Sequence, residues 1–125
     1  MKREIRVVIA GGNRFLRVGL REAVEHAVGL KVAGEVSGGS EELDDVGRLN
    51  PDIVLMEYGM FEKNGIGNQS APVLIYSLEA NELESEKAVE GGAFGYIPSL
   101  ENVQQVVESV LGAAPAAEFI SVKQD

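Results

Sequence analysis

The fold is decided by a short apolar run near the middle of the chain, Ile53-Val54-Leu55-Met56, which is followed at once by Glu57. Because the run has no polar alternation, it is typical of a strand that is covered on both faces. Pro51 stands just before it, and the residue before a proline is driven out of the helical region, so a preceding helix ends there. This run therefore predicts a buried strand in a sheet with helices on both sides.

Further strands and helices alternate around this run. Apolar and β-branched runs predict the other strands, and apolar residues at three- and four-residue steps predict the helices. The second helix opens at Ser40, the expected N-cap, and ends before Pro51. This alternation predicts an α/β fold, a doubly wound sheet of five parallel strands. The other strands are expected at 5–10, 30–36, 73–76 and 94–97, and the other helices at 14–27, 82–90 and 100–111.

Two helices have a clear predicted inner face. In the first, Phe15, Leu16 and Leu20 begin an apolar stripe that runs to Ala27. In the last, the stripe holds four valines, Val103, Val106, Val107 and Val110. We expect both stripes to pack against the sheet.

The third crossover, from Tyr58 to Ala71, has only fourteen residues and contains three glycines. That length is near the lower limit for a parallel crossover, and no apolar period is visible in it. The third helix is expected to be shortened or missing, reduced to a turn or an irregular loop. Residues 1–112 are expected to form one domain, and residues 113–125 a linker-like tail.

Composition excludes several classes of function. The 125 residues carry a formal net charge of −9, which argues against direct nucleic-acid binding by this segment. The absence of cysteine excludes a disulfide scaffold and a thiol nucleophile, and His26 alone cannot build a multi-histidine metal site. No apolar run is long enough to span a bilayer, so we expect a cytoplasmic protein with no membrane contact.

The predicted strand ends carry few reactive groups. In a parallel sheet the site lies at the carboxyl ends of the strands, where Gly11-Gly12-Asn13, Glu57, Ser77 and Pro98-Ser99 should meet. Hydrolysis or phosphoryl transfer there would need a base, a metal or a cationic clamp. One carboxylate, two hydroxyls and no lysine are available. We therefore expect neither an enzyme nor a cofactor.

Several segments, in this order, resemble a response-regulator receiver domain of the chemotaxis type, and most closely the receivers that precede a helix-turn-helix output domain. The resemblance covers nearly the whole chain, including Glu118-Phe119-Ile120-Ser121, which is similar to the linker to such an output domain. It implies a flavodoxin-like fold and a role in two-component signalling, phosphorelay and transcription regulation. The matching segments are 5–10, 16–21, 51–56, 72–77 and 91–96.

The family's functional positions are mostly changed in this chain. The resemblance places Glu57 at the phosphoacceptor position, Gly11 and Gly12 at the two acidic metal-binding positions, Ser77 and Tyr96 at the switch positions, and Ser99 at the lysine position. Mg²⁺ needs oxygen ligands, and Glu57 alone is not expected to hold it. We therefore interpret the chain as a degenerate receiver, or pseudo-receiver, that has no metal site and is not phosphorylated at Glu57.

Several alternatives remain open at this stage. Glu57 is either a permanent mimic of the phosphorylated state that reaches toward Ser77, with Arg14 or Lys63 as counter-charge, or a tolerated polar residue. Gly11-Gly12-Asn13 is either an anion cradle or a tight turn. Tyr96 is either a rotating switch or a half-buried aromatic residue.

The expected function is protein–protein interaction, either with a partner or an output domain or as a homodimer. The resemblance implies that the face of the fourth helix, fifth strand and fifth helix makes these contacts. The acidic residues of segment 82–90 form either a solvated face or a docking surface for a basic partner. Two alternative functions are a small-ligand or anion sensor that uses the vacated pocket, and a residual phosphoacceptor receiver.

Overall fold

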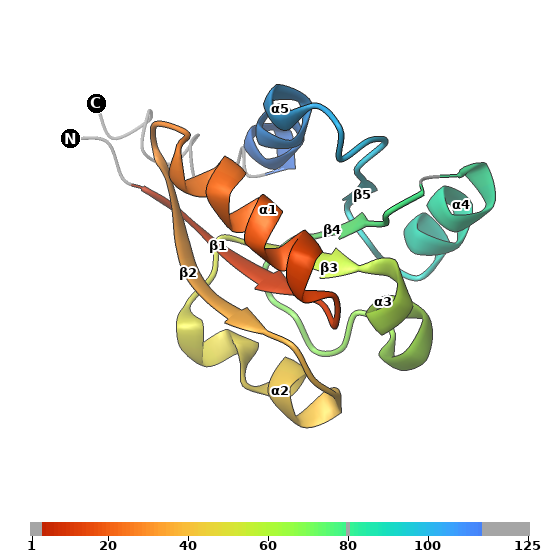
Figure 1. Ribbon diagram of the computed structural model, residues 1–125. Helices are drawn as coiled ribbons and strands as arrows, with labels where there is room; N and C mark the ends of the chain where they lie inside the picture. Colours follow the sequence, from red (N-terminus) through yellow and green to blue (C-terminus); the bar gives the residue numbers. More distant parts are fainter. Residues whose placement is uncertain (1–3, 80, 114–125) are drawn as a thin grey trace.

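The structure, a computed structural model, describes residues 4–79 and 81–113. Five parallel strands form one sheet in the order β2-β1-β3-β4-β5, and helices cover both of its faces (Figure 1). The predicted α/β doubly wound fold is confirmed. The elements are β1 (Ile5–Ala10), α1 (Arg14–Glu25), β2 (Leu30–Val36), α2 (Ser40–Asp44), the 3-10 turn η1 (Val46–Leu49), β3 (Ile53–Glu57), α3 (Tyr58–Asn64), β4 (Val73–Tyr76), α4 (Glu82–Glu90), β5 (Gly95–Tyr96) and α5 (Val103–Ala113).

The apolar run that predicted the fold lies at the centre of the sheet. β3 pairs with β1 on one side and with β4 on the other, and Ile53 to Met56 have no exposed surface. The prediction of a strand covered on both faces is therefore confirmed. The polar residue that follows the run, Glu57, ends β3 at the edge where the strands finish.

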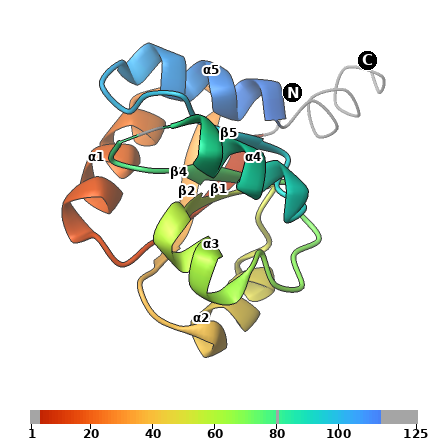
Figure 2. The same cartoon turned by 90° about the vertical axis from the view of Figure 1, so that its right-hand side faces the viewer.

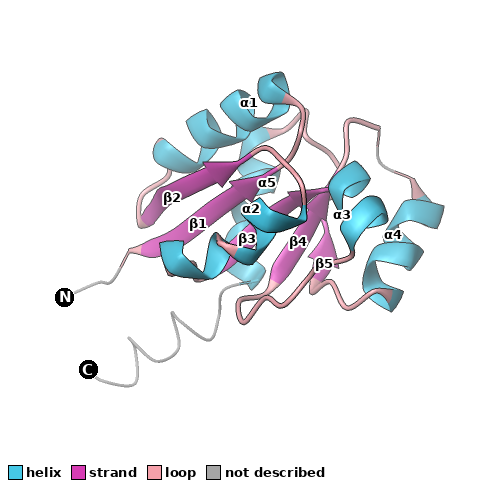
Figure 3. Ribbon diagram, turned by 90° about the horizontal axis from the view of Figure 1, so that it is seen from below, coloured by secondary structure: helices cyan, strands magenta, loops and turns pink. Residues whose placement is uncertain are grey.

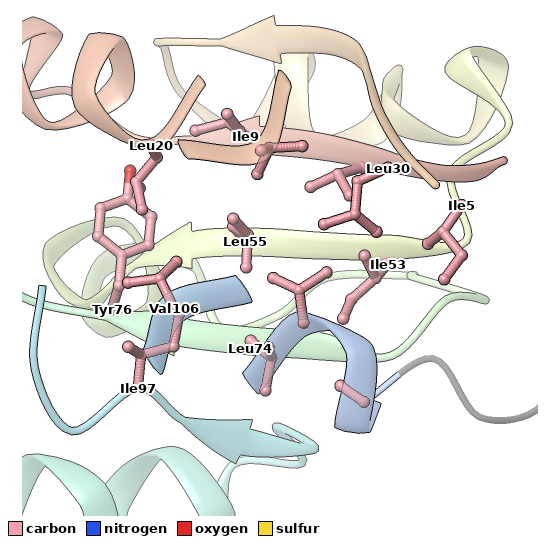
Figure 4. Packing of buried hydrophobic residues seen from close by; sticks show 14 residues of the cluster. Ile5, Ile9, Leu20, Leu30, Ile53, Leu55, Leu74, Tyr76, Ile97 and Val106 are labelled. Carbon is pink, nitrogen blue, oxygen red and sulfur yellow. The ribbon is translucent and has the colours of Figure 1, made fainter. Parts of the chain in front are cut away.

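Two apolar layers hold the helices to the sheet, and Figures 2 and 3 show α1 and α5 on one side and α2 and α3 on the other. Residues Leu20 and Val24 of α1 and Val106 and Val110 of α5 pack on the first face, together with Tyr76 of β4. Figure 4 shows the Tyr76 ring beside Leu20 and Val106. On the second face lie Leu43, Val46, Tyr58, Met60, Phe61 and Ala88.

The third crossover differs from the expectation of a turn or an irregular loop. It begins with a seven-residue helix, α3, which starts directly after Glu57 and buries Tyr58, Met60 and Phe61. Two of these side chains lie three residues apart and therefore share one helix face. The third helix is short but present, and Gly65, with a φ of 69°, ends it.

The predicted second helix is divided in two. α2 ends at Asp44, η1 follows, and Asn50 takes a left-handed conformation with a φ of 55° just before Pro51. Asn50, the residue before Pro51, thus lies outside the right-handed helical region, as predicted from the restriction that proline places on its predecessor. The side chain of Ser40, the predicted N-cap, lies outside the described side chains.

Two apolar residues that were expected to face the sheet face outward instead. Phe15 is 89% exposed and Val103 is 56% exposed, whereas Leu20 and Val106 from the same helices are buried. Helical spacing identifies a stripe, but the width of the stripe that is covered depends on the neighbouring elements. The last helix also begins three residues later than expected and ends at Ala113, whose side chain is buried.

No helix within residues 4–79 and 81–113 is long and apolar enough to cross a membrane. Ala113, the first residue of the predicted linker-like tail, instead belongs to α5 and is buried. The rest of the tail, including the segment Glu118-Phe119-Ile120-Ser121, lies outside the described residues.

Candidate functional site

The carboxylate of Glu57 binds the loop that follows β1. Its Oε1 accepts hydrogen bonds from the backbone N–H of Gly12 at 2.8 Å and of Asn13 at 3.3 Å. Because β1 and β3 are adjacent parallel strands, the end of β3 and this loop meet at the same edge. The structure therefore brings together three of the predicted site positions, Gly11, Gly12 and Glu57.

This loop leads into the N-terminus of α1. Asn13 is the N-cap, and its side-chain oxygen accepts from the N–H of Leu16 at 3.1 Å. The first turn of α1 contains no acidic residue. Glu57 supplies the missing negative charge from another strand, at the end of the helix where the macrodipole favours an anion.

Other backbone groups of the loop and of the end of β1 are also bound within the protein. The N–H of Gly11 donates to the carbonyl of Val36 at 2.9 Å, and the carbonyl of Gly11 accepts from the Arg17 guanidinium at 2.6 Å. The carbonyl of Ala10 accepts from the Tyr76 hydroxyl at 3.3 Å. Hydrogen bonds from four directions therefore fix the loop between β1 and α1.

An arginine pair on α1 reinforces this end of the sheet. Arg17 and Arg21 both contact the Glu35 carboxylate of β2, at 3.3 Å and 2.8 Å. The Arg17 side chain is only 14% exposed, which removes it from most solvent screening. Glu35 thus holds Arg17 in position to bind the Gly11 carbonyl.

Tyr76 ends β4 beside Glu57 and Gly11. It is fully buried, and burial raises its pKa far above the ordinary value for tyrosine. The negative charge of Glu57 raises the pKa further, while Arg17 acts in the opposite direction. Tyr76 therefore remains protonated throughout the neutral pH range, and its hydroxyl donates a hydrogen bond to the backbone of β1.

The two switch positions lie together at the other side of the edge. The Ser77 hydroxyl donates to the carbonyl of Glu79 at 3.3 Å, and it also acts on the pKa of Tyr96 in the lowering direction. The Tyr96 hydroxyl donates to the Glu84 carboxylate at 2.8 Å and accepts from the N–H of Asn81 at 3.3 Å. Burial raises the pKa of the half-buried Tyr96, and the hydrogen bond to Glu84 adds to the rise.

The remaining sequence-predicted positions do not contact Glu57. The Ser99 hydroxyl accepts from the N–H of Glu101 at 3.2 Å, two residues along its own loop. Neither Arg14 nor Lys63 supplies the proposed counter-charge, because no ion pair within the described part of the chain includes Glu57. Lys63 lines the same shallow hollow as Glu57, a space of about 380 Å³ beside Gly12.

The residues at this edge do not fit a magnesium ion. Mg²⁺ is held by carboxylate, phosphate and water oxygens, and Gly11 and Gly12 offer no side-chain oxygen. One oxygen of the Glu57 carboxylate already accepts two N–H groups. Across residues 4–79 and 81–113, no group of three or more His, Cys, Asp or Glu side chains is placed to hold a metal.

The sequence did not single out Tyr76, and it did not predict Asn13 as the N-cap or Glu84 as the partner of Tyr96. A tyrosine at the end of an apolar strand is typical of a core residue. A buried tyrosine hydroxyl nevertheless needs a hydrogen-bond partner, and that requirement could have pointed to a contact at this position. Asn13 before a helical segment is an N-cap signal. The contact between Glu84 and Tyr96 joins residues that only the fold brings together.

Comparison with known proteins identifies several relatives, although no family model matches the chain. It is 30% identical over 113 residues to the chemotaxis protein CheY of Thermotoga maritima, covering 84% of this chain and 93% of that protein. It is 24% identical over 123 residues to the nitrate/nitrite response regulator NarL of Escherichia coli, covering 92% of this chain but 57% of that protein. It spans 31% of a Methanosarcina mazei protein-glutamate methylesterase/protein-glutamine glutaminase, with 26% identity over 111 residues.

Solved structures show the same fold. The receiver domain of the putative response regulator NarL from Mycobacterium tuberculosis matches with a TM-score of 0.76 at 22% identity, covering 90% of this chain and 98% of that domain. The response-regulator domain of Thermotoga maritima CheB matches with a TM-score of 0.65 at 21% identity, covering 92% and 96%. Because the match to CheY extends over nearly the whole of that protein, this chain belongs to the receiver domains of two-component response regulators.

Proposed function

We propose that this receiver domain acts in signalling through protein–protein contacts and without Mg²⁺-dependent phosphorylation of an aspartate. The observation that carries the proposal is the hydrogen bonding of the Glu57 carboxylate to the N–H groups of Gly12 and Asn13. The phosphoacceptor position is occupied by a residue whose functional group is already bound. The loop between β1 and α1, where the metal ligands would stand, itself binds the Glu57 carboxylate.

Charge balance supports the same conclusion. Phosphoryl transfer depends almost entirely on positioning and on neutralising the charge of the transferred group. At this edge the cationic group nearest to the loop, Arg17, is committed to Glu35 and to the Gly11 carbonyl. Position 99 carries a serine whose hydroxyl is turned toward Glu101. An incoming phosphoryl group would therefore meet the negative charge of Glu57, with Lys63 as the cation that lines the same hollow.

Incubation with a small phosphodonor and Mg²⁺, followed by intact-mass spectrometry, tests this proposal. We expect no added phosphoryl group, and a receiver domain with aspartate at the acceptor position serves as the positive control. If a phosphoryl group is added, its absence from the Glu57→Gln or the Ser77→Ala variant identifies the residue that carries it. A phosphoryl group that is lost in either variant would overturn the proposal in favour of a residual phosphoacceptor.

The geometry favours a binding module over an anion sensor. The N–H groups that could cradle an anion at the start of α1 donate to Glu57. The hollow beside them is lined by both the Glu57 carboxylate and Lys63, so its lining carries no net positive charge that would favour an anion. An anion would have to displace Glu57 before it could bind.

The proposed contact surface lies on α4 and β5. α4 buries only Ala88, and Leu83 and Val89 on the same helix are 60% and 57% exposed. Phe94, just before β5, is 57% exposed. Large exposed apolar side chains gathered on neighbouring elements are typical of interaction sites. We assign this α4–β5–α5 face to a second copy of the chain or to an output domain, with control of transcription as the outcome.

The oligomeric state tests the homodimer. We expect the sedimentation coefficient of the wild type to rise with protein concentration, and the Phe94→Ala variant to remain monomeric at concentrations where the wild type associates. Phe15→Ala is the matched control, because Phe15 is an exposed phenylalanine on α1. A wild type that stays monomeric, or an equal effect of both variants, would exclude homodimerisation through this face.

A further inference from the structure

Gly11 faces the end of a buried tyrosine. A Cβ atom added to Gly11 would overlap the hydroxyl oxygen of Tyr76, at a separation that real Cβ atoms do not reach. The next nearest atoms are Cβ and Oε1 of Glu57, at 3.0 Å and 3.1 Å. Any side chain at position 11 therefore needs the Tyr76 hydroxyl to be elsewhere.

The Tyr76 hydroxyl has little freedom to move. The side chain is fully buried, and its ring lies in the apolar layer between the sheet and helices α1 and α5 (Figure 4). A phenol is rigid, with the hydroxyl fixed at the end of the ring, so displacing the oxygen means displacing the ring. The hydrogen bond to the Ala10 carbonyl also holds it at the end of β1.

Gly12 provides a contrast within the same loop. An added Cβ there has only Glu57 Oε1 within 4 Å, at 3.9 Å, and Gly12 is exposed. A side chain at position 12 would therefore be accommodated. The obstacle to a pair of neighbouring carboxylates lies at position 11 alone.

We propose that Tyr76 is the residue that excludes a metal-binding carboxylate from this receiver, because its hydroxyl occupies the volume that a side chain at position 11 needs. Gly11 and Tyr76 form a matched pair, so the loss of the metal site cannot be reversed by restoring acids to the loop. This inference rests on the proposed function and specifies its steric cause.

A set of alanine variants tests the steric part without adding charge. We expect Gly11→Ala to lower the urea midpoint of unfolding clearly more than Gly12→Ala does. In a Tyr76→Phe background, which removes only the hydroxyl, Gly11→Ala should lower the midpoint by less than it does when Tyr76 is present, although the contact with Glu57 Cβ at 3.0 Å remains. If Gly11→Ala folds only when it is combined with Tyr76→Phe, the proposal is supported. Equal effects of Gly11→Ala in both backgrounds would overturn it.

Aspartates at positions 11 and 12 test the metal part. The probe is Mg²⁺ alone, and the measurement is the shift of the melting temperature that it causes. We expect a Mg²⁺-dependent increase when Gly11→Asp and Gly12→Asp are combined with Tyr76→Phe, and none when Tyr76 is retained. The same shift with and without the hydroxyl, or no shift in either protein, would show that Tyr76 is not the excluding residue.

The two proposals fail separately. Phosphorylation of the wild type would contradict the proposed function, whereas the unfolding comparison at position 11 does not depend on any phosphodonor. Conversely, a tolerated alanine at position 11 would remove Tyr76 from the explanation and leave the phosphorylation experiment unaffected.

Discussion

Two tyrosines on neighbouring strands have opposite environments. Tyr76 at the end of β4 is fully buried, and its hydroxyl binds the backbone of β1 across the centre of the sheet. Tyr96 on β5, which pairs with Ile75, is half-buried, and its hydroxyl binds Glu84 and Asn81 of the α4 segment. One tyrosine closes the centre of the site, and the other joins the edge strand to a weakly anchored helix.

The difference divides the molecule into a rigid part and an adjustable part. α1, beside the closed centre, buries Leu20, Ala23 and Val24, whereas α4 buries only Ala88. Regions with few buried apolar contacts open at low free energy, and elements that move in regulation are drawn from such regions. Under the proposed function, this edge is the part of the domain that responds to a partner.

Truncating the two tyrosines should produce the largest contrast. Tyr76→Ala removes a fully buried ring and should lower the free energy of unfolding by about 3–5 kcal/mol, as other aromatic truncations in cores do. Tyr96→Ala leaves a space that water can enter and should cost about 1 kcal/mol. Urea denaturation of both variants measures the difference, and similar losses would contradict the division into two parts.

Removing the Glu57 carboxylate should have an intermediate effect. Glu57→Ala deletes two charge-assisted hydrogen bonds to N–H groups that water can reach, and should cost about 1–2 kcal/mol. Glu57→Gln keeps an accepting oxygen and should cost less. Glu62→Ala, on the exposed side of α3, is the control and should change stability by less than about 0.5 kcal/mol. A loss for Glu57→Ala as small as that for the control would indicate that the bonds contribute nothing to folding.

Loss of the N-cap should lower the stability of the whole domain at Asn13 but only that of one helix at Asn81. Asn13→Ala should lower global stability by about 1 kcal/mol, because α1 unfolds only with the core. Asn81→Ala should lower it by less than about 0.5 kcal/mol, because α4 can fray alone. Hydrogen exchange should show faster exchange limited to the amides of α4. Asn68→Ala, in an exposed loop, is the control, and equal global losses for both caps would contradict independent fraying.

Tyr76→Phe should have only a small effect at neutral pH. It removes one hydroxyl with a long hydrogen bond and should cost less than about 1 kcal/mol. Because the pKa of Tyr76 is raised in the folded state, its full contribution is present below about pH 10, the ordinary pKa of tyrosine, and is lost as pH rises further. The stability of the wild type relative to Tyr76→Phe should therefore begin to fall at about pH 10 and continue to fall as the pH rises further. A difference that is constant with pH would contradict the burial of the hydroxyl.

The sheet could be predicted from the sequence because its signals are local. The apolar run from Ile53 to Met56 predicts a buried strand without reference to any other segment. The alternation of strands with helices then predicts that the strands are parallel. The helix after β3 was expected to be shortened or missing because Gly59 interrupts its pattern, and it is a seven-residue helix. Its stability comes instead from Tyr58 and Phe61, which pack against the sheet.

The site was only partly predictable, for a different reason. Glu57, Gly11 and Gly12 were placed at one edge by fold topology, and the structure brings them together. The binding of Glu57 to the N–H groups of Gly12 and Asn13 was not predicted, because every residue except proline has a backbone N–H and the sequence does not indicate which of them is available. The contact of Tyr76 with the end of β1 spans 66 positions along the chain, so no periodicity reveals it.

The hydrogen bonds of Glu57 also have a consequence for competition. The carboxylate is a tethered ligand, and even flexible tethers give effective concentrations in the millimolar range or above. Free anions in solution at lower concentrations cannot displace it from the start of α1. A contact that displaces β3 relative to the loop between β1 and α1 would break these two hydrogen bonds without any competing anion.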